Sequence, residues 1–157
     1  MKTYEQTGVL TAKDLCMPTE KQLRKGVAVI ECVQQIPCNP CVAVCPSHAI
    51  SMKDINDTPH IDYDTCIGCG KCVAACPGLA IFMIKLLDEK ALITIPYEFL
   101  PVPSVGDSVH AIDREGKNRG TAKVTKVKQS NNTTVVTIEV PKGLAMEIRH
   151  LKVNSHD

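Results

Sequence analysis

The chain has 157 residues, of which 44% are hydrophobic, a composition typical of one ordinary globular domain or two small ones. Its 18 basic residues nearly balance its 17 acidic ones, and the net charge of +1 argues against a role that depends on electrostatic binding to nucleic acid or to a membrane surface. Aromatic residues make up only 3%, so few rings can stack on bases or sugars. We therefore expect a protein partner and no nucleic acid.

Nine cysteines are unusual in a chain of this length and indicate either disulfides or bound metal. The amino terminus, MKTYEQTGVLTAKDL, has no apolar core of the kind found in signal peptides. No run of residues approaches the ~20 apolar positions that span a bilayer. These features predict a cytoplasmic protein without a membrane span, in which thiols stay reduced and clustered cysteines are metal ligands.

Residues 1–26 are polar with weak periodicity and are predicted to form an N-terminal extension that lies over one of the bodies that follow. Cys16 is the only cysteine in this segment and belongs to no motif. A lone cysteine is more often an ordinary buried or half-buried residue than a ligand. Cys16 is therefore left out of the predicted site.

Residues 27–87 contain the other eight cysteines between two apolar runs. VAVIE, from Val27, is typical of a short buried strand, and AIFMIKLL closes the segment at Leu87. The run Cys66-x2-Cys69-x2-Cys72-x3-Cys76-Pro77 is the spacing of bacterial iron–sulfur ligation, in which three thiolates hold one cluster and the fourth reaches the other.

The segment repeats itself with an offset of 31 residues. The repeat aligns one set of six positions with another: Cys38, Cys41, Cys45, Pro46, Ala49 and Ile50 with Cys69, Cys72, Cys76, Pro77, Ala80 and Ile81. Such a duplication predicts two similar half-sites related by approximate two-fold symmetry. One iron–sulfur cluster is then expected on Cys66, Cys69, Cys72 and Cys45, and the other on Cys38, Cys41 and Cys76.

The fourth ligand of the first cluster is the point at which the repeat departs from its pattern. The register places Gln35 where the second copy has Cys66, and Cys32 lies three residues upstream. Because a short loop can carry Cys32 back to the iron, Cys32 is predicted as the fourth ligand. A three-iron cluster ([3Fe-4S]) and a cluster with a non-cysteine ligand are the alternatives. Zinc is a further alternative, although contiguous triplets that end in Cys-Pro are poorly suited to a tetrahedral site.

Residues 88–157 contain no cysteine and no recognisable set of catalytic residue types. The β-prone runs ALITI, SVHAI, GTAKVTKVK and TTVVTIEV alternate with turn signals. Strict alternation from Thr134 to Val140 is typical of a half-buried strand. These features predict a small antiparallel β-barrel or sandwich domain.

With these motifs, residues 27–87 resemble the bacterial-type ferredoxin domain with two [4Fe-4S] clusters. The fold class expected is α+β, with duplicated halves followed by the β domain. ECVQQIPCNPC followed by VAVCP is also similar to the small iron–sulfur subunits of multisubunit flavin-dependent amino-acid (proline or hydroxyproline) or opine dehydrogenases. This resemblance implies flavin-containing dehydrogenase subunits as partners, a hetero-oligomer, and a role in subunit assembly for residues 88–157.

The hypothesis is therefore a subunit that relays single electrons between redox centres, with flavins as the expected centres and no catalytic residues of its own. A stand-alone ferredoxin-like carrier is one alternative. An enzyme that uses an incompletely ligated first cluster is the other, and Gln35 is its only motive.

Overall fold

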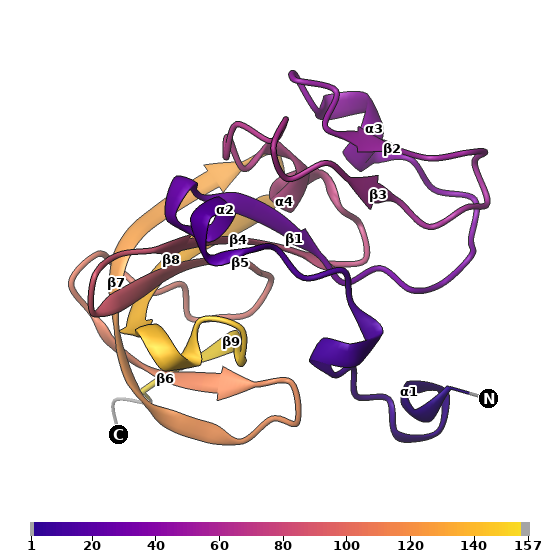
Figure 1. Cartoon of the computed structure of the whole chain (residues 1–157). Helices are drawn as coiled ribbons and strands as arrows, with labels where there is room; N and C mark the ends of the chain where they lie inside the picture. The colour runs from indigo at the N-terminus through magenta and orange to yellow at the C-terminus, as the bar shows by residue number, and fades with distance from the viewer. Residues whose placement is uncertain (1, 155–157) are drawn as a thin grey trace.

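The computed structural model describes residues 2–154, so Met1 of the predicted extension and residues 155–157 of the predicted β domain lie outside the described residues. Its elements follow in chain order: α1 (Thr3–Thr7), η1 (Ala12–Asp14), α2 (Glu20–Lys25), β1 (Val27–Ile30), α3 (Pro40–Val44), β2 (Ile50–Ser51), β3 (His60–Ile61), α4 (Lys71–Ala75), β4 (Ile81–Leu86), β5 (Lys90–Tyr97), β6 (Ser108–Asp113), β7 (Asn118–Ser130), β8 (Thr133–Pro141), η2 (Lys142–Leu144) and β9 (Ile148–Val153). The fold is thus a mixture of many strands and a few short helices (Figure 1).

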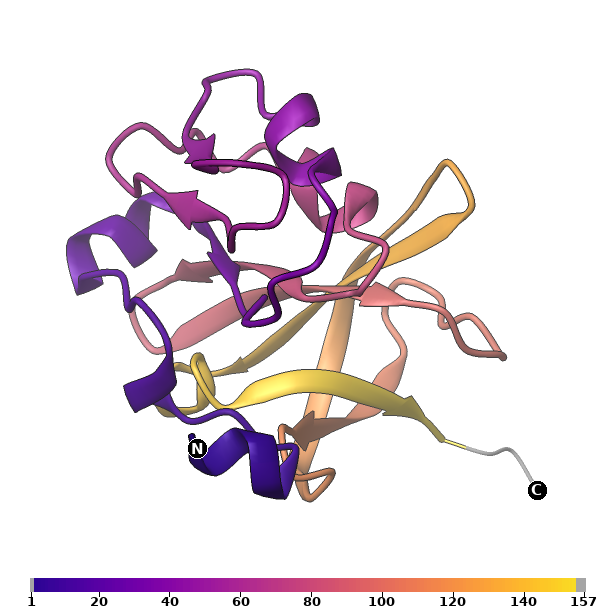
Figure 2. The same ribbon diagram turned by 90° about the vertical axis from the view of Figure 1, so that its right-hand side faces the viewer.

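One antiparallel sheet of seven strands organises the molecule, in the order β1-β4-β5-β8-β7-β6-β9. The small ribbon of β2 and β3, with α3 and α4, lies over the β1-β4-β5 end of this sheet (Figure 2). The sheet is strongly curved, and β9 contacts β5 across the bend. Its hydrogen-bonded order nevertheless ends at β1 and β9 within the described chain, so it is not a closed barrel.

The strands after Leu87 do not form the separate barrel or sandwich that the sequence predicts. β5 pairs with β4 on one side and with β8 on the other, so the sheet passes directly through the predicted boundary at residues 87 and 88. The physical reason is that β4 and β5 are joined by a tight turn, and adjacent antiparallel strands pair across such a turn. β9 is a further strand that the sequence analysis did not identify.

The two faces of the sheet are covered differently. Along β8 the alternation from Thr134 to Val140 is confirmed, because Thr134, Val136, Ile138 and Val140 are all buried inside the curve. Thr137 points to the opposite face and is buried as well. It is buried there because α4 packs on β4, β5 and β8. The cysteine-rich part, which we define as residues 32–76, is therefore held on the outer face of the sheet.

The N-terminal extension contains short helices with local capping signals. In α2 the Thr19 hydroxyl accepts from the Gln22 N–H at 3.3 Å, and the Gln22 side chain accepts from the Thr19 N–H at 2.9 Å. This reciprocal capping box begins the helix, and Gly26, with φ of 90°, ends it. Lys25 then donates to the carbonyl oxygens of Tyr63 and Asp64, which joins the extension to the cysteine-rich part.

The 31-residue offset of the sequence recurs in the backbone. α3 and α4 differ by this offset, and so do the two residues with positive φ that follow them, His48 and Leu79. The pairing of Ile30 with Ile81 corresponds to that of Ile61 with Ile50. Because each pair joins one half to the other, the two halves meet in a reciprocal manner.

Within residues 2–154, no helix has the length and apolar character needed to cross a membrane.

Candidate iron–sulfur site

Four of the predicted ligands line one cavity. Cys32, Cys38, Cys41 and Cys76 lie on the wall of a cavity of about 1150 Å³. Cys38 precedes α3, Cys41 lies in its first turn, and Cys76 ends α4. Gln35 lies on the same wall. The loop before α3 thus brings Cys32 to the cavity that contains the three cysteines of the repeat.

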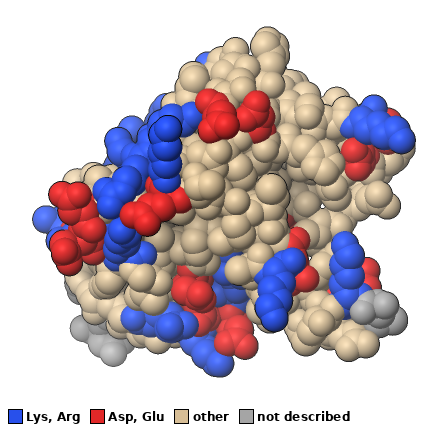
Figure 3. Space-filling view, in the orientation of Figure 1, with Lys and Arg blue, Asp and Glu red and all other residues tan. Residues whose placement is uncertain are grey.

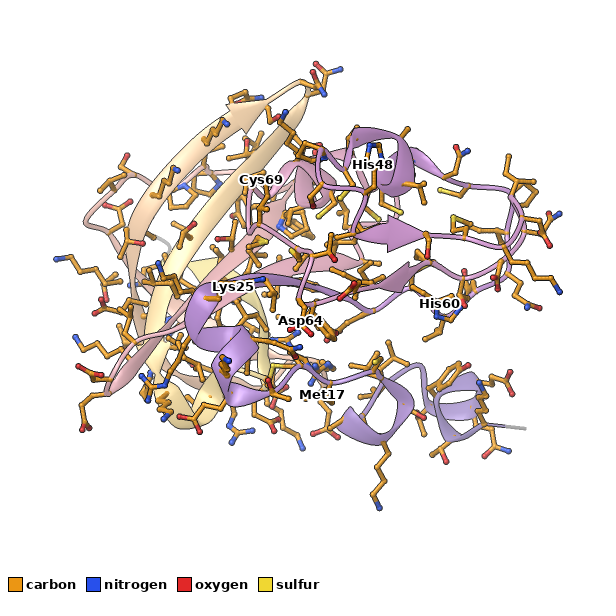
Figure 4. The ribbon with its side chains drawn as sticks, turned by 45° about the horizontal axis from the view of Figure 1, so that its top comes forward. Met17, Lys25, His48, His60, Asp64 and Cys69 are labelled. Carbon is orange, nitrogen blue, oxygen red and sulfur yellow. The ribbon has the colours of Figure 1, made fainter. Side chains whose placement is uncertain are left out.

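The other four predicted ligands line a second cavity. Cys45, Cys66, Cys69 and Cys72 surround it, together with Met83 of β4. Cys69 is exposed, whereas Cys66 and Cys72 are buried. Figure 4 shows Cys69 at the side of the cysteine-rich part that adjoins β7 and β8. Each helix therefore contributes its final cysteine to the cavity formed mainly by the other half, as the motif requires.

Both crossing cysteines end their helices and accept a backbone hydrogen bond. The Ala49 N–H donates to Cys45 Sγ at 3.3 Å, and the Ala80 N–H donates to Cys76 Sγ at 3.4 Å. These contacts are again 31 residues apart. Amide donors aimed at a sulfur stabilise the negative charge of a thiolate and orient it toward a metal.

A close backbone contact shapes the second cavity at Gly68. A Cβ placed on Gly68 would come within 2.7 Å of the Gly26 carbonyl oxygen, and its φ is +70°. Only glycine tolerates both conditions. The loop between Cys66 and Cys69 therefore approaches the end of α2 closely enough to fix both cysteines against the sheet.

Burial and hydrogen bonding shift the pKa of several of these thiols in opposite directions. Burial, with a smaller contribution from the adjacent Cys66 and Cys69, raises the pKa of Cys72 to about 12. Burial likewise raises the pKa of Cys32 and that of Cys41. Burial also acts to raise the pKa of Cys45, but hydrogen bonds from the Ile50 backbone and from Ser47 outweigh it and lower the pKa. Iron binding would release these thiol protons.

A buried ion-pair cluster adjoins Cys32 in the chain. The Glu31 carboxylate accepts from Arg114 Nη2 at 2.5 Å and from Arg149 Nε at 2.7 Å. The side chains of Glu31, Arg114 and Arg149 are 7%, 14% and 4% exposed. Burial acts to raise the pKa of Glu31, but the two arginines outweigh it and lower the pKa. The β6–β7 turn and β9 thus hold the start of the loop that carries Cys32.

The equivalent residue in the second half is held in another way. Asp62 lies 31 residues after Glu31, and its carboxylate accepts from the Asp64 N–H at 2.9 Å and from the Thr65 hydroxyl at 2.7 Å. It therefore caps its own short loop before Cys66. In the first half the corresponding loop, residues 31–38, depends instead on Arg114 of the β6–β7 turn and on Arg149 of β9.

The donor set fits iron–sulfur clusters better than a single metal ion. Within the described range, no three His, Cys, Asp or Glu side chains converge closely enough to hold one ion. A zinc ion needs four ligands around one point, whereas a cluster binds each thiolate through a different iron and so tolerates a wider spacing. The second cavity is narrow, about 10 Å³, so its thiols must move apart to admit a cluster.

Cys16, which the sequence analysis left out of the site, lies apart from the other cysteines. Cys16 lines neither cavity, and its carbonyl oxygen accepts from the Tyr63 hydroxyl at 2.5 Å. Glu31, Arg114 and Arg149 were not identified from the sequence, because no local motif links residues so far apart. The assignment of individual cysteines to iron stays a prediction.

Comparison with known proteins agrees with this arrangement. Residues 31–80 match the family model of a 4Fe-4S dicluster domain, and the matched segment includes all the cysteines except Cys16. No curated protein and no solved structure matched the chain. Residues 31–80 are therefore an iron–sulfur domain of the ferredoxin type, which supports a role in electron transfer.

Proposed function

We propose that the chain is an electron-transfer subunit that holds two [4Fe-4S] clusters. The observation that supports this most directly is the division of eight cysteines between two cavities, four to each. When bound, the clusters would supply one-electron redox chemistry. The protein holds each thiolate, directs N–H groups at Cys45 and Cys76, and buries Cys41, Cys66 and Cys72.

In this proposal the first cluster is bound by Cys32, Cys38, Cys41 and Cys76, and the second by Cys45, Cys66, Cys69 and Cys72. The presence of Cys32 on the first cavity favours four thiolates over a three-iron cluster or a non-cysteine ligand. It also weakens the motive for an enzyme based on an incompletely ligated cluster. We assign no catalytic residue to the chain.

The wider assignment is to a cytoplasmic hetero-oligomer in which the chain relays electrons between flavins of a larger dehydrogenase. Its support is the sequence resemblance of ECVQQIPCNPC and VAVCP to such subunits. A stand-alone carrier would have the same cysteine arrangement. Proteins that co-purify under anaerobic conditions distinguish the two, because a stable flavoprotein complex is expected only for a subunit.

Iron and sulfide analysis of anaerobically purified protein tests the core of the proposal. We expect about eight iron and eight sulfide per chain, with a brown absorbance that dithionite bleaches. Protein that is colourless, redox-silent and loaded with zinc would overturn the proposal. A single reducible cluster would restrict it to one of the two cavities.

A further inference from the structure

We propose that a lysine-rich face beside the second cavity is the docking surface for an acidic protein electron donor or acceptor. The inference rests on the proposed electron-transfer function and names the kind of partner that this function would use. The face comprises five lysines: Lys71, Lys85, Lys123, Lys126 and Lys128.

The strand register places these lysines on the same side of the sheet as the second cavity. One cross-strand row runs from Met83 through Thr94 and Thr137 to Lys126. The hydroxyls of Thr94 and Thr137 lie 2.9 Å apart, which confirms that they share a face. Met83 lines the second cavity. Three strand spacings, about 14 Å, therefore separate the cavity wall from Lys126.

The cross-strand rows on either side of this one carry further lysines. Lys85, Leu92, Glu139 and Lys123 form the next row, and Lys128 lies opposite Val135. These lysines are exposed. Lys71 begins α4, directly after the loop that carries Cys69. Figure 3 shows Lys and Arg gathered on one flank of the molecule, over α2 and the strands beside it.

The charge on this face is largely uncompensated. Glu139 is the acid in these rows, and it pairs with Lys90 at 2.7 Å. Within residues 2–154, none of the five lysines forms an ion pair. Because the whole chain has a net charge of only +1, this positive face must be balanced by acids elsewhere. A local field of this kind attracts an anionic partner.

The position of the face favours a redox partner over other anions. Cys69 is exposed and Ile67 is 64% exposed, so the second cavity opens to solvent beside the lysines. Lysines around an exposed redox centre bring an acidic partner to the point where electrons leave the protein. DNA and anionic lipid would be attracted by the same charge but gain nothing from that opening.

The test measures how fast the dithionite-reduced holoprotein is oxidised by small complexes of opposite charge. The probes are iron(III)–EDTA, an anion, and hexaammineruthenium(III), a cation. In each reaction one electron leaves the reduced protein and converts one iron or ruthenium ion from the 3+ to the 2+ state. The variant is Lys126→Glu with Lys128→Glu. Lys123 is unchanged, because an acid there would face Glu139 across the strands.

At low ionic strength we expect this variant to react about tenfold more slowly with iron(III)–EDTA and faster with the ruthenium complex. Both differences should largely disappear at about 0.5 M salt, because screening shortens the reach of the charges. Lys126→Arg with Lys128→Arg should behave as the parent protein. Lys13→Glu with Lys152→Glu, which makes the same charge change on η1 and β9, should have a much smaller effect.

Equal oxidation rates for the parent and for the variant with Lys126→Glu and Lys128→Glu would overturn the inference while leaving the electron-transfer function intact. Equal effects of the two double Glu variants would also overturn it, since only net charge would then matter. Lysine-dependent binding to duplex DNA or to phosphatidylserine vesicles, without any effect on the rates, would assign the face to another class of partner. Protein without a reducible cluster would overturn both this inference and the proposed function.

Discussion

Cys32 is the one ligand of the proposed first cluster that the repeat does not assign. It lies outside the 31-residue register, because it precedes Cys38 by six positions where Cys66 precedes Cys69 by three, yet it lines the first cavity. Its thiol is half-buried, and burial raises its pKa. These properties suit a ligand that is ordered by metal binding.

We expect Cys32→Ser to remove or convert one cluster and leave the other unchanged. Iron and sulfide should fall toward about four per chain, or a three-iron electron paramagnetic resonance signal should appear in the oxidised protein. Cys16→Ser is the matched control, because Cys16 lines neither cavity. A parent-like spectrum in Cys32→Ser would show that another group supplies the fourth ligand.

Gly68 and Gly70 allow a steric effect to be separated from a backbone effect. Both have positive φ, but a Cβ at Gly68 meets the Gly26 carbonyl at 2.7 Å, whereas one at Gly70 meets the flexible Met83 side chain at 3.6 Å. Gly70→Ala should cost about 1 kcal/mol of unfolding free energy, from backbone strain. Gly68→Ala should cost about 3 kcal/mol or more, because the clash is added. Urea unfolding followed by circular dichroism measures both, and equal losses would contradict the contact.

At the scale of elements, the buried ion-pair cluster joins the loop after β1 to the β6–β7 turn and to β9. Arg149 also donates to the carbonyl oxygens of Ala145 and Ile148, and its guanidinium lies 5.3 Å from the centre of the Phe82 ring. Arg114 donates to the Met146 carbonyl at 2.7 Å. The cluster thus fixes two distant segments against the cysteine-rich part.

Removing one arginine should be far more costly than removing an exposed one. We expect Arg149→Met to lower the unfolding free energy by about 3–5 kcal/mol, because it leaves a buried carboxylate partly unpaired. Arg24→Met, which breaks a pair with Glu20 whose side chains are 45% and 59% exposed, should cost at most about 1 kcal/mol. Chemical denaturation compares them, and similar losses would show that the buried cluster is not specially important.

The contact between β9 and β5 should make stability depend on pH. His150 stacks on Tyr97 with ring centres 6.0 Å apart and meets the edge of Phe99 at 5.1 Å. Burial lowers the pKa of His150 below 6.5. As the pH falls through the unfolded value, the unfolded chain binds a proton that the folded chain does not, so stability decreases.

His150→Gln should therefore lose stability less steeply than the parent between about pH 7.5 and about pH 5. His60→Gln, at a position whose side chain is 72% exposed, is the control and should follow the parent curve. Urea midpoints measured across this range give the comparison. If the parent and His150→Gln show identical slopes, the ring is not buried as a neutral group.

At the scale of the whole molecule, the cysteine spacing was sufficient to predict how seven cysteines divide between the two cavities, because each motif is local and the repeat relates the halves, whereas Cys32 lies outside the repeat. The continuity of the sheet was not predicted. Strand pairing joins residues such as Thr94 and Thr137, which alternation alone cannot match. The buried cluster was missed for the same reason, since Glu31 lies 83 and 118 residues from its two arginines.

The continuous sheet predicts that residues 1–87 will not form a stable two-cluster domain alone. Without β5 the paired edge of β4 is exposed, and the fully buried Ile84 and Ile93 lose each other as neighbours. Glu31 also loses both arginines. We expect this fragment to be aggregated or unable to retain clusters, whereas the full chain should unfold in one transition seen by circular dichroism and visible absorbance together.

Co-expression of residues 88–157 with the fragment is the matched control, because it restores the missing strands without the covalent link. Recovery of brown, soluble protein in the co-expression alone would show that pairing of β4 with β5 and the arginines stabilise the cluster domain. A brown fragment 1–87 that melts at the temperature of the full chain would instead mean that the cysteine-rich part folds independently, with the sheet continuing across residues 87 and 88 only as a contact between two stable units.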